Sequence, residues 1–138
     1  MRTHPRTLVW IAVLAAALAV GCGREAGQGR GDYVAQARGI VEDIDGGRHD
    51  QIRERFDNNL MKMLSEDQLA KAWEVFTDRK GKLKGIADTE VVERDPFTVV
   101  NVLVDMARQD GQVRVSFDEK GKVAGFFLLN TGVPVPER

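Results

Sequence analysis

Few side chains in this sequence could act as a nucleophile or a catalytic base. The only serines are Ser65 and Ser116, and the only histidine beyond the first ten residues is His49. A catalytic triad needs a nucleophile and a base brought together. Ser65 is better explained as a helix cap and Ser116 as an exposed strand residue, while His49 suits a solvated junction between helices. We therefore predict no catalytic residue of this type.

Metal and phosphate chemistry are also disfavoured by the residue types. The sequence has no cysteine cluster and no second histidine near His49, so it predicts no metal ligands and no cofactor. It also has no glycine-rich phosphate loop after a strand. Catalysis by a carboxyl group is the chemistry that remains, because burial in an apolar pocket can raise the pKa of an acid into a catalytic range. Asp88, Glu90 and Asp105 are the acids in predicted strands that could face a pocket.

The single cysteine, Cys22, lies where a specific chemistry can be predicted. Arg2 and Arg6 precede an unbroken apolar run of 13 residues, Leu8 to Val20, and Gly21 and Cys22 follow it. A basic start, a short apolar run and small residues are typical of a signal peptide. The run is shorter than the roughly 20 apolar residues that a membrane-spanning helix requires.

The segment Leu18-Ala19-Val20-Gly21-Cys22 resembles the lipobox of bacterial lipoproteins. Gly21 fits this pattern, whereas Ala19 stands where the lipobox prefers leucine. The resemblance implies lipidation of Cys22 by a diacylglycerol and therefore a lipid bilayer as a partner. It places the protein in the cell envelope, facing the periplasm, and Gly23 favours the outer membrane if the host is Gram-negative. A signal peptide cut nearby and an uncleaved N-terminal anchor are the alternatives.

The composition of the sequence divides the chain into four segments. We predict a signal peptide over 1–21, a lipidated flexible tether over 22–31, one domain over 32–131 and a frayed tail over 132–138. Prolines in the tail cannot continue a ladder of hydrogen bonds. The net charge of −1 and the lack of a basic run argue against binding to nucleic acid.

The first half of the predicted domain has apolar residues at the helical period. Three amphipathic helices are expected, from Asp32 to Gly46-Gly47, from Asp50 to Leu64, and from a capping box at Ser65 and Gln68 to Gly81.

After Gly81 the apolar period falls towards two, which predicts strands. They are expected over Ile86–Arg94, Thr98–Arg108 and Lys122–Asn130, with one more strand directly after Asp110-Gly111. A two-residue turn at that pair would set Met106 opposite Val115 and Val104 opposite Phe117. The last strand is apolar on both faces, so we expect it to be central or covered on both sides. Gly125 within it is expected to mark a bulge or bend.

Helices followed by an antiparallel meander predict an α+β fold, with N-terminal helices on one face of a curved sheet of about four strands. The element order, the Trp73 helix, the Gly81 break and the segment 121–125 resemble a bacterial domain of unknown function with a nuclear-transport-factor-2-like cone fold. That domain is seen on lipoproteins and ahead of α/β-hydrolase domains, and a cystatin-like arrangement is the alternative. The resemblance covers Tyr33 to Leu129 and implies an apolar pocket. Its candidate lining comprises Tyr33, Trp73, Phe76, Val100, Val102, Val104 and Met106.

Two functions remain at this point. The preferred hypothesis is a membrane-tethered, non-catalytic domain that binds a small apolar ligand or an envelope protein. The alternative is a small pocket enzyme of the isomerase or dehydratase type that uses a buried carboxylate, as the resemblance to cone folds allows.

Overall fold

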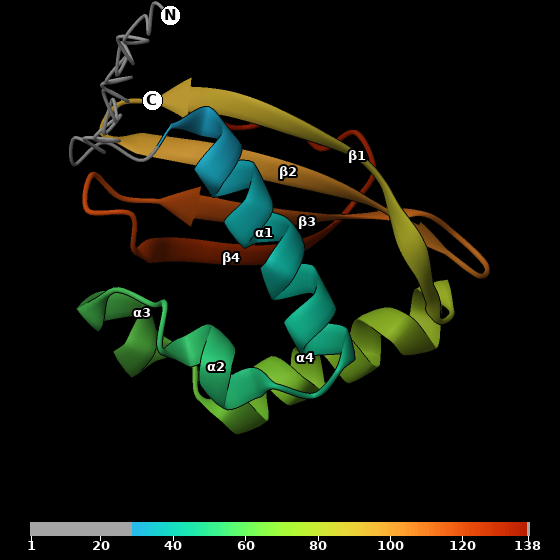
Figure 1. The fold of residues 1–138 in the computed structure, drawn as a ribbon. Coiled ribbons are helices and arrows are strands. Elements are labelled where there is room, and N and C mark those ends of the chain that lie inside the picture. The colour runs from blue at the N-terminus through green and yellow to red at the C-terminus, as the bar shows by residue number, and fades with distance from the viewer. Residues whose placement is uncertain (1–28, 138) are drawn as a thin grey trace, which may run out of the picture.

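The computed structural model describes residues 29–137, which form four helices and then four strands (Figure 1). The helices are α1 (Arg30–Asp45), α2 (His49–Arg53), α3 (Asn58–Met63) and α4 (Glu66–Lys80). The strands are β1 (Leu83–Arg94), β2 (Phe97–Met106), β3 (Gly111–Phe117) and β4 (Val123–Asn130). The sheet is antiparallel in the order β1-β2-β3-β4, and it is curved and unclosed. The α+β class is confirmed, whereas Cys22 lies outside the described residues.

The predicted C-terminal ends of α1 and α4 and the predicted start of α4 are confirmed, whereas α1 begins at Arg30 with Gly29 as its N-cap and not at Asp32. Gly46 caps α1, and Gly47 has a φ of +75°. Ser65 and Gln68 form the capping box of α4, in which the Ser65 Oγ accepts a hydrogen bond from the Gln68 amide at 3.2 Å. Gly81 ends the helix with a φ of +86°, a conformation that glycine adopts without strain.

The prediction of one helix from Asp50 to Leu64 is wrong, because the chain breaks at Phe56. Residues 55–57 run beside β4, where the Asp57 amide donates to the Val123 carbonyl and the Val123 amide donates to the Arg55 carbonyl, both at 2.8 Å. The Asp57 side chain then caps α3 by accepting from the Leu60 amide. A continuous helix and the observed break would both bury Phe56, so the spacing of apolar residues does not distinguish them.

The two-residue turn at Asp110-Gly111 is also wrong. Val104 pairs with Gly111 and Val102 with Val113, so the register is displaced by six residues from the predicted one. An even displacement keeps each side chain on its face, and the valines of β2 and β3 still share one apolar side.

Contacts from α4 explain the wider loop. The Lys80 carbonyl accepts from the Arg108 and Gln109 amides, and the Lys80 Nζ donates to the Asp110 carbonyl at 3.1 Å. Gly111 lies under Phe76, where an added Cβ would come within 2.5 Å of the ring. Glycine is therefore required at 111 for close packing rather than for a turn.

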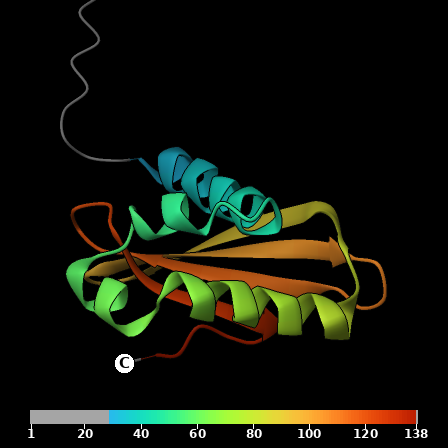
Figure 2. The same ribbon diagram turned by 90° about the horizontal axis from the view of Figure 1, so that it is seen from below.

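The expectation that the last strand is central is corrected, since β4 is an edge strand of the sheet and pairs along its length with β3, while only Val123 at its start also bridges to Phe56. The predicted irregularity at Gly125 is confirmed by a register shift between Ser116 and Phe117. One face of the sheet carries α1, and α4 runs along the β4 side (Figures 1 and 2). Phe126 and Leu128 are thereby half-buried, while Phe127 remains 50% exposed.

Candidate functional site

The residues predicted to line a pocket all lie in the closed core. None of the seven is more than 9% exposed, and the four on β2 are at most 3% exposed. Tyr33 packs on Phe117 with ring centroids 4.9 Å apart, and Trp73 stacks on Phe76 at 5.5 Å. Of the seven residues, only Phe76 also lines the groove between α4 and β4. The space between the β2 valines and the helices is therefore occupied by the protein's own side chains.

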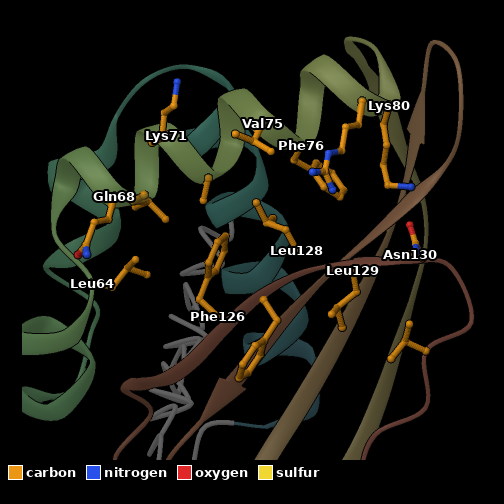
Figure 3. Close-up of a pocket in the computed structure, with 15 residues that line it drawn as sticks. Leu64, Gln68, Lys71, Val75, Phe76, Lys80, Phe126, Leu128, Leu129 and Asn130 are labelled. Carbon is orange, nitrogen blue, oxygen red and sulfur yellow. The ribbon is translucent and has the colours of Figure 1, made fainter.

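An apolar groove lies between α4 and β4, with a volume of about 780 Å³ (Figure 3). Its α4 wall includes Leu69, Ala72, Val75 and Phe76, and its β4 wall includes Phe126 and Leu128. Figure 3 shows Phe126 and Leu128 pointing from the strand towards the helix.

The position of β4 at the sheet edge creates this groove. Among the residues that the structure describes, no strand of the sheet lies beyond β4, and α4 faces β4 on this side and leaves a gap beside it. The outward side of α4 presents Ala72 and Val75, of which Val75 is 39% exposed. The groove was not predicted from the sequence, although two features of the sequence indicated it. Val75 is an apolar residue beside the buried stripe of its helix, and a strand that is apolar on both faces has to find cover on both sides.

The candidate strand acids do not meet in the structure. Asp88 is exposed and accepts from the neighbouring Thr89 amide, and Asp105 lies 4.0 Å from the Lys84 Nζ. Glu90 accepts from the Asn101 Nδ2 at 3.1 Å. None of the three lines the apolar groove. Ser65 acts as the expected helix cap, Ser116 pairs with Gly125 in the sheet, and His49 begins α2.

The described residues bring no group of three histidine, cysteine, aspartate or glutamate side chains together in a way that could hold a metal ion. Within residues 29–137, the helices are too short or too polar to span a bilayer.

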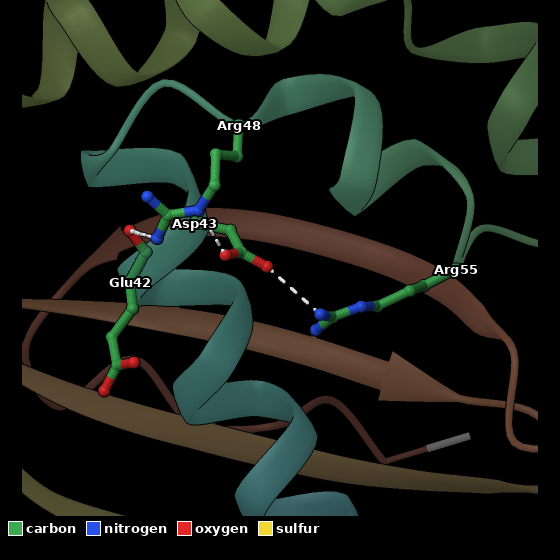
Figure 4. A network of polar contacts seen from close by, with 4 residues as sticks. All are labelled: Glu42, Asp43, Arg48 and Arg55. Atoms are coloured by element: carbon green, nitrogen blue, oxygen red, sulfur yellow. Dashed lines mark hydrogen bonds and ion pairs between the residues drawn. The ribbon is translucent and has the colours of Figure 1, made fainter.

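A carboxylate between two arginines joins α1 to the following segment (Figure 4). The Asp43 side chain is 13% exposed and accepts from the Arg48 Nε at 2.8 Å and from an Arg55 terminal nitrogen at 3.1 Å. Arg48 also donates to the Glu42 carbonyl. Both carboxylate oxygens of Asp43 are engaged, so this cluster stabilises the α1–α2 junction rather than offering a free acid.

A second polar cluster lies on the face of the sheet opposite α1. Asn101, Gln112 and Arg114 are buried there, and the Asn101 Oδ1 accepts from the Gln112 Nε2 at 3.0 Å and from the Arg114 Nε at 2.8 Å. Burial lowers the pKa of the Arg114 guanidinium below its ordinary value, while Glu90 acts in the opposite direction. Arg114 also donates to the carbonyls of Val133 and Pro134. The tail that the sequence predicts to fray is thus held against the sheet.

Arg114→Met should release this tail, because methionine fills similar space but donates no hydrogen bond to the Val133 and Pro134 carbonyls. We expect the amides of Val133 and Val135 to lose order in backbone NMR relaxation. Arg38→Met, at an exposed arginine of α1, is the matched control and should leave them unchanged. Equal order in the Arg114→Met variant and the wild type would contradict the assignment.

The comparisons with known proteins identify a family. The model described as "Protein of unknown function (DUF3887)" matches residues 37–126, which run from α1 into β4 and include the α4 wall of the groove but only Phe126 of its β4 wall. No curated protein and no solved structure matches the chain.

Proposed function

We propose, for a chain that belongs to the DUF3887 family of proteins of unknown function, that it is a lipid-anchored, non-catalytic domain whose α4–β4 groove binds a small apolar ligand. The observation that carries this proposal is the groove itself. We place the anchor at Cys22, in the cell envelope and facing the periplasm.

The size and lining of the groove suit a small molecule. Small-molecule sites generally have volumes of about 300–1,000 Å³ and mostly apolar walls with a few polar groups. The groove has a volume of about 780 Å³ and is walled by leucine, valine and phenylalanine side chains. Val75 and Phe127 are 39% and 50% exposed, so a ligand that covered them would gain hydrophobic free energy.

The anchor would hold this groove near a source of apolar molecules. An acylated Cys22 is separated from Gly29 by a segment that spans at most about 25 Å when fully extended. Two or more acyl chains hold a protein stably on a bilayer. The domain would then stay close to the membrane surface, where apolar ligands partition. The cone-type arrangement implied by the sequence resemblance is consistent with the curved, open sheet, and we include it in the proposal.

The alternative hypothesis is a small pocket enzyme that uses a buried carboxylate. It requires an acid in an apolar pocket, and Asp88, Glu90 and Asp105 lie away from the groove.

Trp73 provides a direct test of ligand binding. Its indole stacks on Phe76, which lines the groove, so a brominated ligand bound there should quench its fluorescence. The full chain carrying Trp10→Phe, which leaves Trp73 as the only tryptophan, is reconstituted in phosphatidylcholine vesicles. We expect saturable quenching by ω-bromodecanol and little quenching by a phospholipid brominated on its acyl chain.

Ala72→Phe should lower the apparent affinity for ω-bromodecanol, measured from the quenching curve, at least about tenfold. The reason is that the added ring occupies the groove at an exposed position of α4. Ala35→Phe, at an exposed position of α1, is the matched control and should bind as the wild type does. Quenching that is absent, or that survives Ala72→Phe unchanged, would count against the groove as the ligand site.

A further inference from the structure

The charges around the groove have one sign. Among the described residues that line it, Lys71, Arg79 and Lys80 are basic and none is acidic. The chain as a whole carries slightly more acidic than basic residues, so this local excess is not a consequence of composition. An apolar groove with a basic rim complements an amphiphile whose charged end is negative.

The three cations differ in how far they are already engaged. The Lys80 Nζ donates to the Asp110 carbonyl at 3.1 Å and lies 5.7 Å from the centre of the Phe76 ring. The Lys71 Nζ pairs with the Glu74 carboxylate at 3.0 Å. Within residues 29–137, the Arg79 side chain makes neither a hydrogen bond nor an ion pair, although it lines the groove. Arg79 is therefore the cation that a ligand could engage without breaking an existing contact.

We propose that the groove selects a single-chain alkyl carboxylate, with its chain along α4 and its carboxylate bound by Arg79. This inference rests on the proposed function of the groove and adds the class of ligand. The planar guanidinium of arginine donates two parallel hydrogen bonds to a carboxylate, which makes this pair stronger and more specific than a contact with a lysine.

The geometry of α4 favours one extended chain. Gln68 and Arg79 both line the groove and are separated along the helix by about 16 Å, given a rise of about 1.5 Å per residue. The side chains between them on the groove wall are mainly apolar, namely Leu69, Ala72, Val75 and Phe76. A long, narrow apolar wall with a free guanidinium in its last turn suits a head at Arg79 and a tail running towards Leu64.

Displacement of ω-bromodecanol from the vesicle-bound chain tests the head-group preference. Decanoate, decanol and decyltrimethylammonium have equal chain lengths and differ in charge, and their free aqueous concentrations are compared above the pKa of the carboxylic acid. We expect decanoate to displace the probe at a concentration about fivefold lower than decanol, because hydrogen bonds to a charged group are strong but exposure at the rim weakens them. The cationic amphiphile should be the weakest competitor.

Arg79→Gln should abolish this preference, and a circular dichroism spectrum that matches the wild type shows that the variant is folded. Arg38→Gln, at an exposed arginine of α1 outside the groove, should keep the preference. Equal displacement by decanoate and decanol, or a preference that survives Arg79→Gln, would overturn the inference and leave the proposed apolar site standing. Failure of ω-bromodecanol to quench Trp73 at all would overturn both proposals.

Discussion

Phe117→Ala is expected to lower the free energy of unfolding by about 3–5 kcal/mol, the usual cost of deleting a large buried aromatic side chain. The Phe117 ring is fully buried and packs on Tyr33 from α1. Phe117 is the last residue of β3, where it pairs with Thr98 of β2 and with Val123 of β4. Its removal would leave a cavity where α1 meets the sheet. Total stabilities of small domains are about 5–15 kcal/mol, so this variant should be close to unfolding.

Urea denaturation followed by circular dichroism measures this effect. Phe127→Ala, on the neighbouring strand, is the matched control, because its ring is 50% exposed and should cost much less. Similar losses in the two variants would show that the face of β4 or the position of α1 has been assigned incorrectly.

Cys22→Ser should move the protein from the membrane fraction to the soluble fraction, or block its processing at the N-terminus. The expected effect is nearly complete, because each buried methylene of an acyl chain contributes about 0.8 kcal/mol and a lipoprotein carries at least two chains. Fractionation of cells that express the full chain, with mass spectrometry of the N-terminal peptide, measures both outcomes. Membrane retention with normal cleavage in the serine variant would exclude Cys22 as the anchor.

Much of the fold could be predicted from residues that are close together in the sequence. The Ser65–Gln68 box and the Gly81 stop are encoded by neighbouring residues, and the alternation of β2 fixes which side of the strand is apolar. The register of β2 against β3 could not be predicted from neighbouring residues in this way. It depends on Lys80, which closes the loop from 30 residues away, and on the ring of Phe76 above Gly111.

The candidate site was harder to predict from the sequence than the fold. Periodicity identifies residues that avoid water, but it does not distinguish a closed core from an open wall. Trp73, Val102, Phe126 and Leu128 are all apolar residues of predicted elements, although the first two are buried in the core and the last two line the groove. What separates them is the position of β4 at the edge of the sheet, a property of strand order that no single segment carries.

The most direct test of the central claim is methyl NMR of the labelled full chain titrated with decanol. A ligand in the α4–β4 groove should shift the methyl resonances of Val75 and Leu128 and leave those of Val100 and Val102 in place. The opposite pattern, with shifts confined to Val100 and Val102, would place the ligand between the sheet and α1 and would contradict the account.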